Sequence, residues 1–464
     1  MQIGQSSSHA EGVALLTKGF IQSLCGEFQK HNSIDPAHYE HMDVKRGLRN
    51  ADGTGVMAGI TQIGNVQGYY IQDGDKVPME GRLIYRGINV EDLIHGFVSE
   101  QRFGFEETAY LLLFGALPTK EQLEIFDHVL FDYRVLPTGF TEDMIIKAPS
   151  PDVMNKLARS ILALYSYDPH PEDTSLEHEL HQALTLVARC PTIIAHAFAV
   201  KRHYYDNESL YLHRPQDNLS MAENFLYSVR QDNKFTQEEA RLLDLCLVLH
   251  AEHGGGNNSA FACRVLSSSG TDIYSAVAAA VGALKGPRHG GANIKVMEMF
   301  GHIQENVKDW KDDAEVTAYL GQLLGKQAGD HSGLIYGMGH AIYTLSDPRA
   351  KLLKQFARNL AKQKGMLPEF ELVESVERLS PPLINRAKGE HKSICANVDL
   401  YSGLVYQMLD IPGELYTPLF AMARMVGWCA HRLEEVYNPG NKIIRPAYKA
   451  VAPAQTFVPL DRRG

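Results

Sequence analysis

Hydrophobic residues recur at helical spacing along most of the chain from about residue 105 onward. Start signals agree with that spacing, because Thr119 with Gln122 and Thr236 with Glu239 form capping boxes, each directly before an amphipathic run. Strand signals are few and are confined to the N-terminal part of the chain. The pattern therefore predicts an all-α fold with a minor β element.

The strand signals lie in residues 61–71, a stretch punctuated by glycine, and in a short run at residues 83–85. Farther along, residues 272–285 and 414–431 are apolar on nearly every face, which in a soluble protein is typical of helices that neighbours surround. No apolar run reaches the roughly 18 residues that would span a bilayer, and the pair Pro381-Pro382 predicts a turn. We expect a large helical core of two or more layers.

Composition and charge narrow the class of protein. The 464 residues are 44% hydrophobic and carry a formal net charge of -10, without the basic excess that nucleic acid or an anionic membrane would require. Six scattered cysteines form no Cys-x-x-Cys pair and are expected to be reduced core residues. Because Glu11 and Lys18 interrupt the N-terminal segment early, it does not resemble a leader peptide, and we expect a cytoplasmic protein.

Three histidines lie beside glycines at predicted loop-helix junctions: His253, His289 and His340. Glycine there lets the backbone approach a ligand closely and lets a side chain be aimed. A single histidine in this setting usually has a structural role, whereas three of them favour a shared site. The pair His250 and His253 also invites a metal-dependent hydrolase as an alternative, but the His-Glu-x-x-His spacing of zinc hydrolases is missing.

Two arginines lie where a cation needs an anionic partner. Arg349 follows Asp347-Pro348, a helix-start signal, so it lies where the helix dipole disfavours positive charge. Arg424 lies in the middle of an apolar run, where an unpaired charge would be strongly destabilising. Either arginine could form a structural ion pair or bind a substrate carboxylate.

Asp399 completes the set, in an Asn-Val-Asp motif that opens a helical segment. A carboxylate there could simply interact favourably with the helix dipole. Taken together with the histidines and arginines, it indicates acid-base chemistry on a small substrate with several carboxylates.

At these same segments the chain resembles the citrate synthase family, from about Lys45 to the C-terminus. The resemblance rests on an ordered set of motifs: His-x-x-His at His250, Gly-Pro-x-His-Gly-x-Ala-Asn at Gly286, Gly-x-Gly-His-Ala followed by Asp-Pro-Arg, Asn-Val-Asp, Phe-x-x-x-Arg, and Arg-Pro at Arg445. Where many members have Glu and Pro, this chain has Gly254 and Ala396, so the local loop geometry at these two positions can differ from that of the family.

The resemblance implies a role for each site residue. His289 and Asp399 would act on acetyl-CoA, and His340 on the oxaloacetate carbonyl. Oxaloacetate or citrate would be bound by His253, Arg349, Phe420, Arg424 and, from the second subunit of a dimer, Arg445. Coenzyme A would be contacted by the loop and neighbouring residues Ile335, Tyr336, Gly337, Met338, Gly339, Lys392 and Asn397.

The resemblance also implies the architecture and the reaction. A large helical domain, residues 1–292 and 404–464, would carry a small domain, residues 293–403, that closes over a cleft. The enzyme would condense acetyl-CoA with oxaloacetate and hydrolyse citryl-CoA to citrate and CoA, at the entry to the tricarboxylic acid cycle, with no permanently bound cofactor or metal and as a homodimer or higher oligomer.

Two other functions remain open at this point. A 2-methylcitrate synthase would use propionyl-CoA with the same residues, since one methylene changes preference by only about 1 to 3 kcal/mol. A non-catalytic protein that binds CoA or carboxylates would be expected to have lost His289, His340 or Asp399, and this chain retains all three.

Overall fold

The structure is a computed structural model that describes residues 20–438, 440 and 442–463. The chain forms two compact units, a terminal unit of Met1–Gly59 with Arg445–Gly464 and a main unit of Ile60–Ile444. Glu11 and Lys18, on which the expectation about the N-terminal segment rests, lie outside the described residues.

The described residues of the terminal unit form little regular structure. Residues 20–31 are helical, a short helix α2 spans Ala37–Glu40, and single 3-10 turns occur at Arg46–Leu48 and Leu460–Arg462. Cys25 lies in this unit and is exposed, so the prediction that all six cysteines are core residues is wrong for this one, whereas the other five are buried and none is in a disulfide.

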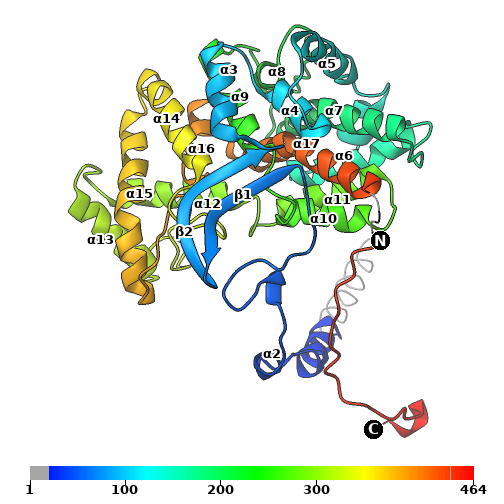
Figure 1. The fold of residues 1–464 in the computed structure, drawn as a ribbon, viewed down its shortest axis with the longest axis vertical. Helices are drawn as coiled ribbons and strands as arrows, with labels where there is room; N and C mark the ends of the chain where they lie inside the picture. Colours follow the sequence, from blue (N-terminus) through cyan, green and yellow to red (C-terminus); the bar gives the residue numbers. More distant parts are fainter. Residues whose placement is uncertain (1–19, 439, 441, 464) are drawn as a thin grey trace, which may run out of the picture. The chain divides into compact units, whose positions relative to one another are not determined.

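The main unit is dominated by α-helices, which confirms the predicted all-α class (Figure 1). In chain order these are α3 (Val90–Ser99), α4 (Phe105–Phe114), α5 (Lys120–Tyr133), α6 (Val153–Leu164), α7 (Leu176–Tyr205), α8 (Met221–Val229), α9 (Gln237–His250), α10 (Asn258–Ser267), α11 (Ile273–Lys285), α12 (Ala292–Asn306), α13 (Asp313–Leu324), α14 (Pro348–Gln363), α15 (Leu367–Lys388), α16 (Asp399–Met408) and α17 (Tyr416–Tyr437). Shorter helical turns occur at Thr141–Ile146, Tyr165–Tyr167 and Gly413–Leu415.

Side-chain caps fix where several of these helices begin. Both predicted capping boxes are present, at the starts of α5 and α9, and a third one, Ser220 with Glu223, starts α8. The predicted cap of α14 is also present, because the Asp347 carboxylate accepts a hydrogen bond from the Arg349 N–H, with Pro348 in the first turn.

The prediction of a turn at Pro381-Pro382 is wrong, because both prolines lie inside α15. A proline has no N–H and ordinarily weakens a helix interior. Here the Ser380 hydroxyl donates to the Val376 carbonyl, and Phe370, Leu372, Val373, Val376 and Ile384 bury one face of the helix. Burial of that apolar face outweighs the local preference of the two prolines.

The centre of the main unit is α17, which is buried from Tyr416 to Leu433 and packs against α4, α7, α9, α10 and α11 (Figure 1). The other apolar run of the sequence, residues 272–285, forms α11, which is also largely buried. Contrary to the sequence prediction, one helix, α7, is long and apolar enough to cross a membrane by length and composition, but 78% of that apolar window is buried inside the protein, as in a core helix.

A small antiparallel sheet supports the site. Strand β1 (Gly64–Gln72) pairs with β2 (Asp75–Tyr85), and β2 pairs with β3 (Ile88–Asn89). The second strand is much longer than the predicted run at residues 83–85. Asp73 and Gly74 join the two long strands, both with positive φ, at 53° and 90°, which is the geometry of a tight hairpin turn.

The hairpin packs closely on the segment that follows His340. A Cβ at Gly68 would lie 2.5 Å from the Ile342 carbonyl oxygen, so only glycine allows this approach. The Thr344 hydroxyl donates to the Gly68 carbonyl, and the Gly81 N–H donates to the Ser346 hydroxyl at 3.1 Å. The sheet therefore holds the loop between His340 and α14 in place.

Helices α12 to α16 pack mainly on one another. They meet the remainder through α14, which contacts α9 and β2, and through α16, which contacts the turn Gly413–Leu415. Figure 1 shows α13, α14 and α15 together on one side of the main unit. The boundaries of the small domain, residues 293–403, fall inside this unit and stay a prediction.

Candidate active site

The ring of His253 lies against two other aromatic rings in the loops after α9 and before α14. Its centroid is 5.2 Å from that of His340 and 5.6 Å from that of Tyr343, and His340 and Tyr343 are 4.6 Å apart. Burial, together with the charge of Arg349, lowers the pKa of the His253 imidazole well below its ordinary value. The Nε2 atom of His253 is buried and has no hydrogen-bond partner among the described residues, as expected for a group that awaits a ligand.

The tautomer of His340 is set by the backbone. Its Nδ1 atom accepts hydrogen bonds from the N–H groups of Ile342 and Tyr343, both at 3.1 Å. A nitrogen that accepts cannot carry the proton, so the neutral ring holds it on Nε2. His340 can therefore donate a hydrogen bond from Nε2.

His289 is held by the start of α10. Its Nε2 atom accepts from the Ser259 N–H at 3.3 Å and lies 3.0 Å from the Ser259 hydroxyl, which in turn accepts from the Trp428 indole N–H at 3.1 Å. Burial, aided by Arg424, lowers the pKa of the His289 imidazole to about 4. The ring is therefore neutral at pH 7, with its proton on Nδ1, and it can donate from that atom.

Arg349 has a permanent partner. Its Nε and Nη2 atoms donate to the two carboxylate oxygens of Asp347, at 3.0 and 2.8 Å. Burial would lower the pKa of the Arg349 guanidinium, but Asp347 raises it above its ordinary value. Asp347 also accepts from the Val398 N–H at 3.2 Å, next to Asp399. Of the two alternatives for Arg349, the structural ion pair is thus observed, and the pair links α14 to α16.

Arg424 is buried without such a partner. Its Nε atom donates to the His250 carbonyl at 2.6 Å, and Nη2 is buried without a hydrogen-bond partner among the described residues. Burial lowers the pKa of the guanidinium to about 10, which leaves it charged at pH 7. An unsatisfied buried cation is strongly disfavoured unless an anion binds it. Arg424 therefore meets the requirement for a carboxylate-binding residue.

Asp399 is the first residue of α16, and its N–H donates to the Asn397 side-chain oxygen at 3.0 Å. Burial raises the pKa of its carboxyl to about 6, although Arg349 acts in the opposite direction. The carboxylate is thus a stronger base than an ordinary aspartate and still mostly ionised at pH 7.

Asn397 ties the Asp399 motif to the glycine loop before His340. Its side chain donates to the Gly339 carbonyl, and its N–H donates to the Gly337 carbonyl, both at 2.9 Å. Met338 forms a β-bridge with Ala396, one of the two positions where the chain departs from the family pattern. At the other, Gly254 has φ of +80° and donates to the Glu252 carboxylate. Both departures therefore fit into ordered loops.

The remaining predicted residues divide into those near the site and those away from it. Phe420 packs on the His250 ring at 4.4 Å and lies 4.8 Å from the Arg424 guanidinium carbon. Lys392 is exposed and lies 3.1 Å from Glu390. Arg445 is exposed and belongs to the terminal unit, so the main unit contains the other site residues without it.

Sequence reasoning missed three groups that shape the site: Ser259, Asp347 as the partner of Arg349, and Tyr343. Ser259 lies two residues after the helix cap Asn257, but nothing in the spacing indicates that it meets a histidine thirty residues later. No group of three or more His, Cys, Asp or Glu side chains that could hold a metal occurs among the described residues.

Two neutral imidazole donors, a carboxylate of raised basicity and a buried cation that no carboxylate hydrogen-bonds define an acid-base site for an anionic substrate. The comparisons with known proteins then specify the family. The family model described as "Citrate synthase, C-terminal domain" matches residues 51–447. The chain belongs to the citrate synthase family.

The similarity extends over most of the chain. The citrate synthase of Deinococcus radiodurans is 36% identical over 370 residues, which is 79% of this chain and 89% of that protein. The crystal structure of citrate synthase from Pyrobaculum aerophilum matches with a TM-score of 0.73 at 31% identity, over 90% of this chain and 95% of that chain. A ternary complex of carboxymethyl coenzyme A and oxaloacetate with the Thermoplasma acidophilum citrate synthase matches with a TM-score of 0.72 at 26% identity. The match covers 90% of this chain and 99% of that chain.

Proposed function

We propose that the protein condenses acetyl-CoA with oxaloacetate and hydrolyses the citryl-CoA formed, releasing citrate and CoA. The observation that carries the proposal is the state of the two imidazoles. His289 and His340 each accept a backbone N–H on one nitrogen and so present a neutral N–H donor on the other. Two such donors suit a reaction in which negative charge develops on two carbonyl oxygens in turn.

The first step is removal of a proton from the acetyl methyl group. A thioester methyl is a weak carbon acid, so the enolate oxygen must be stabilised while a base takes the proton. We assign the base to Asp399, whose carboxyl has a pKa raised to about 6. His289 donates from Nδ1 to the thioester oxygen, and the positive charge of Arg424 adds to the field at that histidine.

The second step is attack of the enolate carbon on the oxaloacetate ketone. His340 donates from Nε2 to the carbonyl oxygen as it becomes an alkoxide. Arg424 binds one substrate carboxylate through its unpartnered Nη2, and the Nε2 of His253 supplies a further contact. Arg349 contributes charge, although Asp347 engages two of its nitrogens. Water then cleaves the thioester bond of citryl-CoA.

The glycine loop of residues 335–339 supports the proposed CoA site. Gly337 and Gly339 both have positive φ, and their carbonyl groups are engaged by Asn397. We assign the adenine end of CoA to this loop and its phosphates to Lys392. Arg445 would complete the dicarboxylate site of a partner subunit, which requires at least a dimer. A cytoplasmic location remains a prediction from the sequence.

Steady-state kinetics with oxaloacetate and either acetyl-CoA or propionyl-CoA tests the proposal. CoA thiol release should depend on oxaloacetate, yield citrate, and be faster with acetyl-CoA at equal concentrations. A higher kcat/KM with propionyl-CoA would make the protein a 2-methylcitrate synthase. CoA binding without any thiol release would identify a non-catalytic relative, and loss of activity in chelator would favour a metal-dependent hydrolase.

A further inference from the structure

A buried carboxylate lies directly behind the site and has no role in the proposed reaction. Glu252 is 0% exposed, and its Oε2 atom has no hydrogen-bond partner among the described residues. It lies between two glycines: a Cβ at Gly64 would come within 2.8 Å of its side chain, and a Cβ at Gly427 would come within 2.8 Å of Oε2. Two positions of the chain therefore leave room for this carboxylate.

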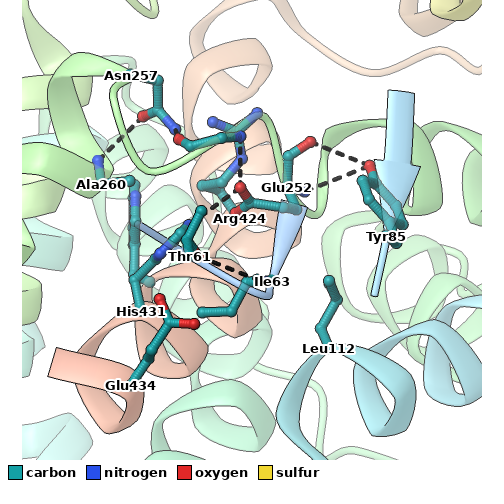
Figure 2. A network of polar contacts seen from close by, with 12 residues as sticks. Thr61, Ile63, Tyr85, Leu112, Glu252, Asn257, Ala260, Arg424, His431 and Glu434 are labelled. Carbon is teal, nitrogen blue, oxygen red and sulfur yellow. Dashed lines mark hydrogen bonds and ion pairs between the residues drawn. The ribbon is translucent and has the colours of Figure 1, made fainter. Parts of the chain in front are cut away.

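Gly427 also allows Glu252 to lie beside Arg424. A Cβ at Gly427 would also lie 3.3 Å from Cδ of Arg424, so the two charged side chains approach one another over that residue. Figure 2 shows Glu252 and Arg424 next to each other. The two side chains form no hydrogen bond with each other, and Nη2 of Arg424 has no partner among the described residues. Burial lowers the pKa of the Arg424 guanidinium, and the charge of Glu252 acts in the opposite direction.

A chain of polar contacts behind Glu252 keeps the carboxylate ionised and fixed in place (Figure 2). Its Oε1 atom lies 3.0 Å from Nε2 of His431 and accepts from the Gly254 N–H. Nδ1 of His431 accepts from Arg264 at 3.1 and 2.7 Å, so Nε2 of His431 carries a proton and donates to Glu252. Burial raises the pKa of the Glu252 carboxyl, but His431 and Arg424 outweigh it and the net direction is downward.

We propose that Glu252 is a positioning residue that acts through Arg424: its carboxylate balances the guanidinium charge in the empty site and thereby weakens the grip on the substrate and product carboxylates. The inference rests on the proposed function, because it assumes that Arg424 binds oxaloacetate and citrate. The carboxylates of Glu252 and of the substrate are both negative, and in a buried site two like charges repel each other strongly. Glu252 thus prevents Arg424 from holding citrate too tightly for turnover.

Calorimetry of oxaloacetate binding to Glu252→Gln tests the proposal. Gln keeps the acceptor for Gly254 and His431 and removes only the charge. The Kd for oxaloacetate should fall by about tenfold, or about 1.4 kcal/mol, and citrate should inhibit more strongly while kcat decreases. A purely structural role cannot produce tighter binding, so an unchanged or raised Kd in a folded variant would overturn the proposal.

Two further variants serve as control and as substitute. Glu435→Gln removes a carboxylate from the far side of Arg264, 2.7 Å from its Nη1, and should leave the Kd within about twofold. If Glu252→Gln does not fold, Glu252→Asp decides, because it keeps the charge: a Kd within about threefold of the wild type supports the electrostatic role, and a larger loss overturns it. A wild-type chain that does not bind oxaloacetate would overturn the proposed function, and this inference with it.

Discussion

The two arginines of the site differ in what surrounds them, and the difference has a measurable consequence. Arg349 forms a bidentate ion pair with Asp347. Among the described residues, no carboxylate lies within 4 Å of the Arg424 guanidinium nitrogens, so Arg424 forms no such pair. Removing one partner of a buried ion pair leaves the other charge without compensation, which is strongly destabilising. Removing Arg424 has a smaller effect, because Glu252, the carboxylate beside it, keeps its contacts with His431 and the Gly254 N–H.

We therefore expect Arg349→Met to lower the free energy of unfolding by about 3 kcal/mol, and Arg424→Met to lower it by much less. Arg424→Met should nevertheless raise the Kd for oxaloacetate more than 100-fold, because truncating a charged contact to a ligand costs about 3 kcal/mol or more. Urea unfolding and calorimetry measure the two quantities. Equal destabilisation by both variants would contradict the assignment of Arg424 to the ligand.

The raised pKa of the Asp399 carboxyl predicts how the activity depends on pH. A base must be deprotonated to act, so kcat/KM should be constant at neutral pH and fall tenfold per unit as pH decreases below about 6. His289, with a pKa of about 4, stays neutral over the same range and does not contribute to this limb. A pH-rate profile that stays flat down to pH 5 would argue against Asp399 as the base.

Residue types at the site were predictable from the sequence, but their protonation states were not. The glycines beside His289 and His340 and the apolar run around Arg424 are local features of the sequence. Which nitrogen of His289 carries the proton depends on Ser259, which the fold brings to it from another element. The partner of Arg349 was two residues away, yet the predicted cap role of Asp347 concealed its second contact.

Among the helices and strands, local sequence signals predicted the structure correctly where nearby side chains form the hydrogen bonds that the backbone needs. The capping boxes of α5 and α9 were recognised because all their donors and acceptors lie within four residues. The second half of the hairpin was missed although Asp73-Gly74 is a strong turn signal, because β2 contains Pro78 and Gly81 and lacks strict alternation. The two prolines inside α15 show that burial can override local preference.

One glycine of the loop before His340 packs tightly against α16. Gly337 has φ of +83°, and a Cβ there would lie 2.9 Å from Cα of Leu400 in α16. Gly337→Ala should therefore displace the loop from the Asp399 motif and raise the KM for acetyl-CoA at least tenfold. Gly365→Ala is the matched control, since its φ is +71° but nothing lies within 4 Å of the added Cβ. It should lose about 1 kcal/mol of stability and keep its KM; an equal KM in both variants would contradict the role of the loop.

For the whole molecule, closure of the predicted small domain should make binding ordered. If oxaloacetate contacts Arg349 in α14 and Arg424 in α17 together, it should draw α12 to α16 toward the remainder and create the CoA site. Acetyl-CoA should then bind at least tenfold more tightly in the presence of a non-reactive oxaloacetate analogue. If calorimetry gives the same affinity for acetyl-CoA with and without the analogue, the proposed domain closure is wrong.

Assembly is tested by mixing subunits. Arg424 belongs to the main unit and Arg445 to the terminal unit, and the proposed site takes one from each of two subunits. An Arg424→Ala chain combined with an Arg445→Ala chain should regain up to about a quarter of wild-type activity, since one site in four is intact in a random mixture of dimers. Confirmed heterodimers without any recovery would contradict a shared site.

In the proposed first step, Asp399 removes a methyl proton from acetyl-CoA while His289 stabilises the enolate. Exchange of the methyl protons with deuterated solvent, in the presence of a non-reactive oxaloacetate analogue, isolates this step from condensation and hydrolysis. The account predicts exchange by the wild type and a loss of about 100-fold to 10,000-fold in Asp399→Asn, with normal folding and oxaloacetate binding. Undiminished exchange in that variant would show that another group is the base.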